Sequence, residues 1–83
     1  MFELRISRKA EKQIKNLKKE YQFEIIELLA EIKEEPFLGK PLDRNLNRRF
    51  SYRIRVYRII YKVNLKDKVV DILSAGHRGI VYN

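Results

Sequence analysis

The sequence predicts an α+β domain with the element order βααβββ, in which two N-terminal antiparallel helices pack on one face of a small antiparallel sheet. Three observations support this fold class. Apolar residues recur at helical spacing through the first 35 residues, they alternate with polar residues from residue 49 onward, and a segment containing glycine and proline separates the two patterns. The 83 residues hold no repeat and no linker, so we expect one domain over residues 1–83.

The first part of the chain predicts a strand followed by a helix. Residues 2–6 alternate between apolar and polar, as a half-buried strand does. Ser7 stands where an N-cap accepts a hydrogen bond from the first helical turn. Lys18 and Lys19 are expected in the last turn of this helix, where they suit its negative end. One apolar stripe marks the helix: Ala10, Ile14, Leu17 and Tyr21.

A second helix is expected over residues 22–34. Its end follows from Pro36, because the residue before a proline is pushed out of the helical region. The short link between the helices implies that they run antiparallel. The residues expected to face inward are Ile25, Ile26, Leu28, Leu29 and Ile32.

Beyond a loop at residues 37–41, the apolar period is that of strands. The apolar phase reverses after Val56, which predicts a tight turn near Arg55 and Val56. With the helices on one face of the sheet, Arg58 and Lys62 project from the other face, which is the expected binding surface. The strands are expected at residues 49–54, 57–63 and 69–74, with a polar turn at 66–68.

The net charge of +8 is unevenly distributed along the chain. Residues 1–35 hold eight Lys/Arg and eight Asp/Glu, whereas residues 36–83 hold eleven Lys/Arg and three Asp, which is the whole net charge. Clustered like charges destabilise a compact state, so a phosphate backbone is the favoured partner. The alternatives are a surface that only keeps the protein soluble and a surface for an acidic protein.

Several classes of protein are excluded by composition. The chain has no cysteine and one histidine, so it lacks disulfides and the cysteine-based or paired-histidine metal motifs. We therefore expect no metal and no cofactor. Apolar runs stay well short of the ~20 residues of a membrane span, and the N-terminus lacks the apolar core of a signal peptide. We expect a cytoplasmic protein.

Arginines interleave with tyrosines along residues 52–61. Guanidinium groups bind phosphates and aromatic rings stack on splayed bases, so the pattern favours RNA binding. The alternative is that the tyrosines belong to the core and the arginines only extend to solvent. The candidate RNA-binding residues are Arg49, Arg53, Arg55, Lys62 and His77.

A second candidate site lies in the C-terminal run. Gly76 and Gly79 flank His77 and Arg78 just after the last expected strand, where backbone can approach a ligand closely. Tyr82 follows Arg78 by four residues, close enough to share a site. Arginines beside a tyrosine favour its anionic form, which a general base requires. The alternative is that this tyrosine only packs.

Three motifs resemble those of the RelE/ParE toxin superfamily: residues 36–42, residues 53–61, and His77-Arg78 with Tyr82. The element order extends the similarity over the whole chain. The resemblance implies the toxin of a type II toxin–antitoxin system, acting as a ribosome-dependent endoribonuclease on messenger RNA. It also implies a cognate RelB-like antitoxin in a hetero-oligomer, which we expect to cover the basic surface with an acidic segment.

The resemblance assigns a role to each catalytic candidate. Arg58 matches the arginine that stabilises charge on the phosphate, and Arg78 the one that assists the leaving group. Tyr82 matches the base that activates the 2′-hydroxyl for attack on the adjacent phosphate. Arg53 and Arg55 fall where the family has lysines. Without a metal, guanidinium groups must stabilise the charge that gathers on the phosphate oxygens.

Two features depart from the family pattern. The turn at Arg55-Val56 lacks the usual glycine, which leaves the register of Arg53 open by a residue or two. Relatives that use a carboxylate need an acid near the site, and the second half offers only three aspartates, which argues against that variant.

Two other functions stay open. ParE-like toxins share the fold and inhibit DNA gyrase, and a non-catalytic RNA- or ribosome-binding domain would also explain the charge. The set of Arg58, Arg78 and Tyr82 discriminates between them, because it is expected in the ribonucleases and generally incomplete in gyrase inhibitors.

Overall fold

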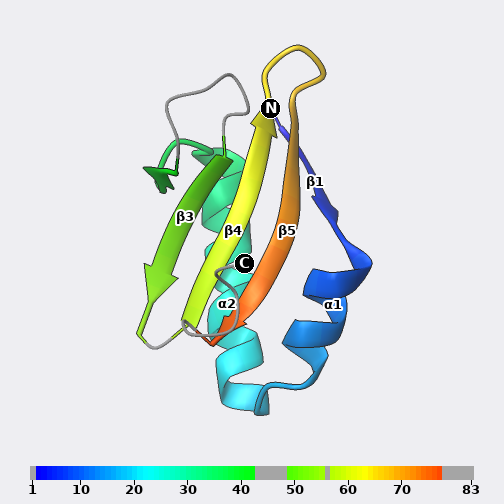
Figure 1. Cartoon of the computed structure of the whole chain (residues 1–83), viewed down its shortest axis with the longest axis vertical. Coiled ribbons are helices and arrows are strands. Elements are labelled where there is room, and N and C mark those ends of the chain that lie inside the picture. The colour runs from blue at the N-terminus through cyan, green and yellow to red at the C-terminus, as the bar shows by residue number, and fades with distance from the viewer. Residues whose placement is uncertain (1, 43–48, 56, 78–83) are drawn as a thin grey trace.

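The computed structural model of the chain describes residues 2–42, 49–55 and 57–77. In these ranges the chain forms two helices and one five-stranded sheet in the order β1-β5-β4-β3-β2 (Figure 1). The predicted α+β fold is confirmed. The helices are α1 (Arg8–Lys15) and α2 (Lys19–Glu34). The strands are β1 (Glu3–Ile6), β2 (Lys40–Pro41), β3 (Arg49–Ile54), β4 (Tyr57–Asn64) and β5 (Val69–His77).

The sheet is antiparallel except at β1, which pairs in parallel with β5. The helices carry the chain from β1 to the far edge of the sheet, and the meander β3-β4-β5 then returns beside β1 in the same direction. At that far edge, residues 40–41 form the short strand β2 rather than the expected loop, with Pro41 opposite Phe50. Proline fits there because it has no N–H group and an edge strand leaves one side unpaired.

The first helix begins as predicted and ends earlier. Ser7 caps it, with the Ala10 N–H donating to Ser7 Oγ at 3.0 Å. The helix ends at Lys15, so the placement of Lys18 and Lys19 in its last turn was wrong: Lys18 is the N-cap residue of α2. The apolar stripe runs on through Leu17 and Tyr21 without a change of phase, so the pattern could not reveal the break.

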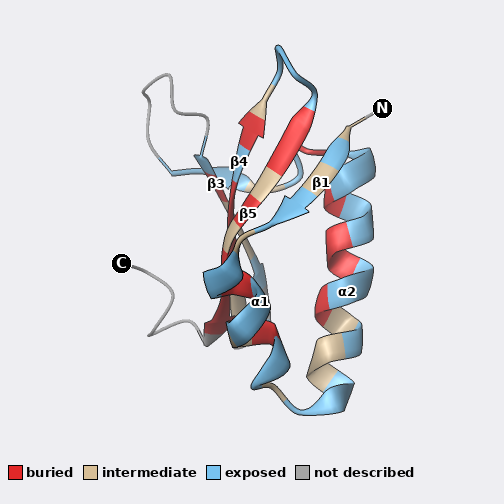
Figure 2. Ribbon diagram, turned by 90° about the vertical axis from the view of Figure 1, so that its right-hand side faces the viewer, coloured by how far each residue is buried: buried red, intermediate tan, exposed pale blue. Residues whose placement is uncertain are grey.

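Helix α2 packs across one face of the sheet and lies behind it in Figure 1. Its buried residues are Ile25, Leu28, Leu29 and Ile32, as predicted. Ile26, also expected to face inward, is 54% exposed. At about 100° per residue, the four buried residues fall within an arc of about 100° on the helix, and Ile26 lies beyond the edge of that arc. Figure 2 shows the result, a buried stripe on one side of α2 and an exposed one on the other.

Strand β5 contains a bulge that the sequence did not reveal. Its register with β4 shifts between Ile60 and Tyr61, because Leu73 is an extra residue in β5. The shift lets both Ile72 and Ala75 reach the core, although they are three positions apart and would face opposite sides of a regular strand. The strand therefore continues to His77, beyond the predicted end at residue 74.

Helix α1 packs along the part of β5 that β1 leaves uncovered. Ser7 Oγ donates to the Leu73 carbonyl at 3.0 Å, and the Ala75 N–H donates to Gln13 Oε1 at 2.9 Å. These bonds satisfy backbone groups at the bulge that a neighbouring strand would otherwise satisfy. Helix α1 and its cap thus hold β5 at Leu73 and Ala75, beyond the part of β5 that pairs with β1.

Candidate nucleic-acid interface

The face of the sheet opposite α2 carries cations that lie directly across from one another. Arg53 pairs with Arg58, and Arg49 with Lys62, on the neighbouring strands β3 and β4. Opposed side chains in such a pair point to the same face, with Cβ atoms ~5 Å apart, and like charges there destabilise the sheet. We call these four residues the basic face. Two pairs of like charge on adjacent strands concentrate positive charge on this face of the sheet.

The neighbours in β5 and β1 complete two rows across the sheet. Gly76 pairs with Arg58, so no side chain of β5 stands beside this half-buried arginine. In the other row, Asp71 pairs with both Lys62 and Arg5 and lies between two cations. Charge is thus partly balanced at the Lys62 row.

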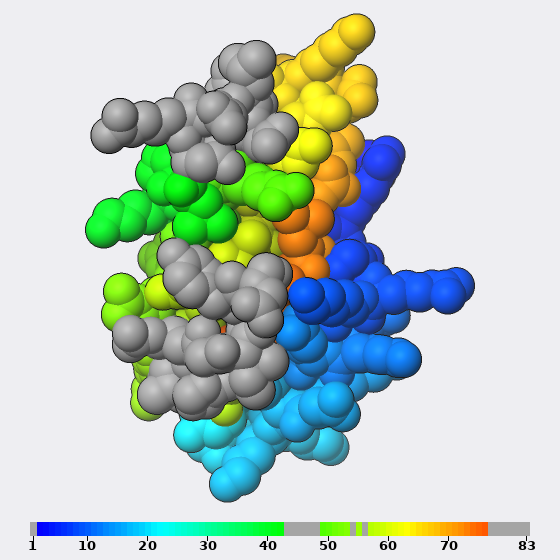
Figure 3. Space-filling view, in the orientation of Figure 1, coloured from blue at the N-terminus to red at the C-terminus, as the bar shows by residue number. Residues whose placement is uncertain are grey.

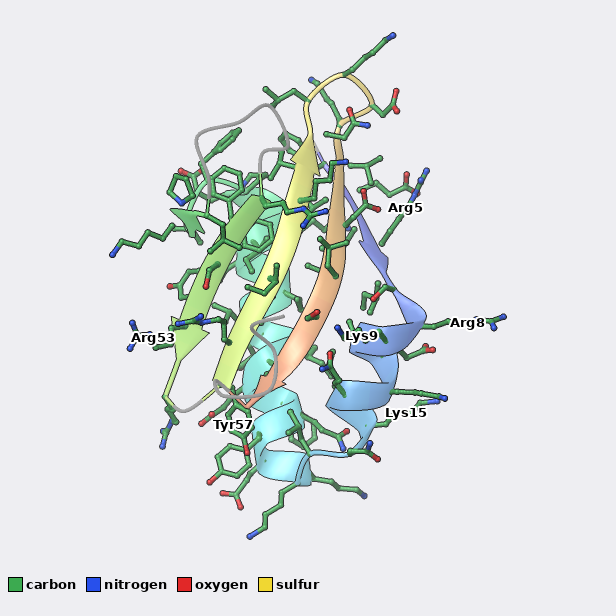
Figure 4. The ribbon with its side chains drawn as sticks, viewed as in Figure 1. Arg5, Arg8, Lys9, Lys15, Arg53 and Tyr57 are labelled. Atoms are coloured by element: carbon green, nitrogen blue, oxygen red, sulfur yellow. The ribbon has the colours of Figure 1, made fainter. Side chains whose placement is uncertain are left out.

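Basic side chains of β1 and α1 lie along the edge of the same face that is farther from β3. Figure 4 shows Arg5, Arg8, Lys9 and Lys15 along that border, with Arg53 across the sheet from them. Sequence reasoning missed them because residues 1–35 carry no net charge. Counted by element, residues 1–18 hold six Lys/Arg and two Glu, whereas residues 19–35 hold two Lys and six Glu. Four of the six cations in residues 1–18 thus border the basic face, whereas most of the glutamates lie on α2.

A pocket opens beside the basic face where residues 38–42 meet β3. Its volume is about 410 Å³. Figure 3 shows the green segment that contains β2 at the border of this face. Among the described residues, the lining consists of Leu38, Gly39, Lys40, Pro41, Leu42, Ser51, Tyr52, Arg53 and Arg58.

Tyr61 holds one wall of this pocket from inside the core. Its hydroxyl donates to the Pro36 carbonyl at 2.8 Å and accepts from the Gly39 N–H at 2.9 Å. Its ring stacks on Phe50 at 5.5 Å, and Phe37 meets the edge of Phe50 at the same distance. Burial raises the pKa of Tyr61 above its ordinary value of 10.0. It is therefore a structural tyrosine, and the core interpretation is confirmed for this residue.

Other predicted site residues lie elsewhere. Arg55 sits in the predicted β3–β4 turn with φ 54°, and its Nε lies 3.3 Å from Glu24 Oε2 on α2. The backbone of His77 pairs with Tyr57 inside β5, rather than following the strand. Arg78 and Tyr82 lie outside the described residues. The structure thus brings together Arg49, Arg53, Arg58 and Lys62, and it turns Arg55 toward α2.

Within residues 2–42, 49–55 and 57–77, no three acidic or histidine side chains gather as a metal site would require. In the same ranges, neither helix is long and apolar enough to cross a membrane.

Comparisons with known proteins agree on one family. The model of the ParE toxin of type II toxin–antitoxin systems, parDE, matches residues 4–82. Toxin RelG of Mycobacterium tuberculosis is 37% identical over 54 residues, which are 64% of this chain and 62% of RelG. The toxin–antitoxin complex RelBE2 of the same organism aligns with a TM-score of 0.82 at 29% identity, covering 93% of this chain and 98% of that one. The archaeal RelE–RelB complex of Pyrococcus horikoshii OT3 aligns with a TM-score of 0.84 at 27% identity, covering 96% and 98%.

Proposed function

The chain belongs to the ParE toxin family of type II toxin–antitoxin systems, within the RelE/ParE superfamily, and we propose that it cleaves messenger RNA on the ribosome. The observation that carries this proposal is the basic face. On this face Arg53 lies opposite Arg58, and Arg49 lies opposite Lys62, so four cations gather on two neighbouring strands. A sugar–phosphate backbone supplies anions at regular spacing along an extended surface.

The proposed reaction is a transesterification within the RNA strand. The phenolate form of Tyr82 takes the proton of the 2′-hydroxyl, and the 2′-oxygen attacks the adjacent phosphorus. The bond to the 5′-oxygen of the next nucleotide breaks, and that oxygen takes a proton from solvent water. The products are a 2′,3′-cyclic phosphate and a 5′-hydroxyl. Arg58 stabilises the negative charge on the phosphate oxygens, and Arg78 stabilises the departing oxygen. This division of roles for Arg78 and Tyr82 rests on the family resemblance, and that of Arg58 also rests on its place in the basic face.

We further propose that a cognate antitoxin covers the basic face and inhibits the toxin in a hetero-oligomer. The solved relatives RelBE2 and RelE–RelB are themselves toxin–antitoxin complexes. An acidic segment is the expected occupant, because residues outside 19–35 carry a net charge of +12 against −4 within that segment. A toxin that acts on ribosomes works in the cytoplasm.

The second candidate function is inhibition of DNA gyrase. The matching family model is named for ParE toxins, which favours this alternative. A gyrase inhibitor needs a protein-binding surface rather than a phosphate site. It would keep its activity when the phosphate-binding arginines are removed one at a time.

The experiment that separates these functions is primer extension on translated messenger RNA after induced expression of the chain. Ribosome-dependent cleavage gives new 5′ ends within codons, and these ends disappear when translation initiation is blocked. Arg58→Ala is the test variant, and Lys33→Ala on α2 is the control that removes the same charge far from the basic face. Intact messenger RNA combined with inhibited gyrase supercoiling would refute the proposal and favour the alternative.

A further inference from the structure

We propose that the pocket between residues 38–42 and β3 binds the nucleotide next to the phosphate held by Arg53 and Arg58. The inference deepens the proposed function and rests on it. The pocket combines two kinds of surface that a nucleotide requires together. Arg53, Arg58 and Lys40 supply positive charge, and exposed apolar side chains supply a surface for a base.

The apolar part of the pocket is exposed in the free protein. Leu38 is 44% exposed and Leu42 is 37% exposed, and both line the pocket with Pro41. Apolar side chains next to a cationic surface are poor sites for a phosphate alone. They suit the face of a nucleobase, which is apolar and carries its phosphate a short distance away.

The register of the strands places the charges around this surface. Lys40 pairs with Ser51, and Arg53 follows Ser51 by two residues, so the three side chains emerge on the same face. Arg53 in turn pairs with Arg58. A nucleotide whose phosphate lies on the two arginines therefore has its base toward Leu38 and Leu42. Lys40 is placed to meet the phosphate on the other side of that nucleotide.

The pocket wall is fixed before a ligand arrives. The Tyr61 hydroxyl ties Pro36 and Gly39 to the core, and the Leu42 N–H donates to the Arg49 carbonyl at 2.8 Å. A Cβ atom at Gly39 would lie 2.6 Å from the Tyr61 hydroxyl oxygen, so this close approach requires glycine. Because the wall is already ordered, binding does not have to order it, and a single nucleotide can be selected by shape.

A titration of the isotopically labelled full chain tests the inference. The probe is adenosine 3′,5′-bisphosphate, and inorganic phosphate is the matched control. The bisphosphate is expected to shift the amide signals of Gly39, Lys40 and Leu42 together with that of Arg53. Inorganic phosphate is expected to shift the signal of Arg53 and to leave those of Gly39 and Leu42 in place. Equal shifts by the two ligands would overturn the proposal, because the base would then contribute nothing.

The matched variant is Leu38→Ala with Leu42→Ala, which changes exposed side chains and leaves the Tyr61 clamp intact. We expect it to lower the affinity for the bisphosphate on the order of tenfold, the scale of losing the contact with one base, and to leave the affinity for inorganic phosphate unchanged. Lys33→Ala serves as the control for both ligands. Unchanged bisphosphate affinity in the double variant would also overturn the proposal.

The same variant separates this inference from the proposed function. If the chain cleaves messenger RNA through this pocket, the double variant changes which bases flank the cut, as primer extension reports. If cleavage occurs with an unchanged pattern, the proposed function stands and the pocket proposal fails. If cleavage is never seen and the bisphosphate still shifts the pocket signals, the pocket proposal stands alone. Shifts produced by an antitoxin peptide but not by the bisphosphate would assign the pocket to a protein partner and refute it.

Discussion

The basic face and the outer face of α2 are both charged, and they have opposite signs. On the basic face, Arg53 opposes Arg58 across two strands. On α2, glutamates recur four residues apart, as Glu20 with Glu24 and Glu27 with Glu31 do, so like charges are neighbours there as well. Each face therefore contains repulsion that folding alone does not require. A molecule with this polarity approaches a polyanion with α2 turned away.

The two faces also differ in their apolar content. The outer face of α2 exposes Phe23 by 67% and Ile26 by 54%, in the midst of glutamates. The apolar residues beside the basic face, Leu38 and Leu42, instead line a pocket whose charges are positive. Exposed apolar residues thus lie in different surroundings in the two regions. Beside the basic face they line a pocket of about 410 Å³, whereas on α2 they lie on the convex surface of a helix.

Removal of Arg58 tests the basic face most severely. We expect Arg58→Ala to lower the single-turnover rate of messenger RNA cleavage by about 10²–10³, as loss of one preorganised charge donor does. Lys33→Ala on α2 is expected to keep the wild-type rate. Ribosome-bound message with mapped cut sites provides the measurement. A cleavage rate for Arg58→Ala equal to that of the wild type would contradict the proposal that this face stabilises charge on the phosphate during cleavage.

Salt tests whether the basic face binds phosphates as a set. If it contacts about five phosphates, a fourfold rise in salt should weaken the affinity for single-stranded RNA by roughly a hundredfold. Arg53→Ala is expected to reduce the slope of log K against log salt by the share that one phosphate contact contributes. Lys33→Ala should leave the slope unchanged. Equilibrium binding to a single-stranded RNA at several salt concentrations gives these slopes. Equal slopes for the two variants would contradict the view that the basic face, and not α2, contacts the phosphates.

Tyr61 tests the support of the pocket wall. Tyr61→Phe removes the hydroxyl that bonds Pro36 and Gly39, and we expect the free energy of unfolding to fall by about 1–3 kcal/mol. Burial raises the pKa of Tyr61 in the folded state, so its contribution to stability is fully present below pH 10 and is lost as pH rises through the folded pKa. Urea unfolding between pH 8 and about 12 should therefore show a steeper alkaline decline for the wild type than for the variant. Parallel declines would show that ionisation of Tyr61 does not contribute.

Ser7 tests the junction of α1 and β5. The Ser7 hydroxyl accepts from Ala10 and donates to Leu73, so Ser7→Ala removes the helix cap and one bond to the bulge. The expected loss is about 1–2 kcal/mol of unfolding free energy. Hydrogen exchange should be faster at the Ala75 amide, which α1 protects. Exchange that speeds up uniformly across the sheet would show instead that the cap acts only on global stability.

The outer face of α2 should give the smallest effect. Phe23→Ser changes a side chain that is 67% exposed, so we expect the free energy of unfolding to change by no more than about 0.5 kcal/mol. RNA cleavage is expected to stay at the wild-type rate. Thermal unfolding and the primer-extension assay measure the two quantities. A clear loss of cleavage would place part of the functional surface on α2 and break the distinction between the two faces.

The sequence by itself determined the elements and their type. Apolar spacing located both helices and the three long strands, and the reversal of phase after Val56 located the β3–β4 turn that the structure has at Arg55. The period-two pattern also placed Arg58 and Lys62 on the face opposite the helices. These features depend on neighbours within one segment, which the sequence shows directly.

Tertiary structure decided which segments meet. The parallel pairing of β1, the bulge at Leu73 and the clamp of Tyr61 on Gly39 all join residues far apart in the chain. The register that opposes Arg53 to Arg58 was open by a residue or two until the pairing of β3 with β4 fixed it. Tertiary structure also separated the charges of residues 1–35, which have no net charge, into a basic border at residues 1–18 and an acidic helix α2. Charges balanced along a chain separate in space when the elements that carry them pack on different sides of the sheet.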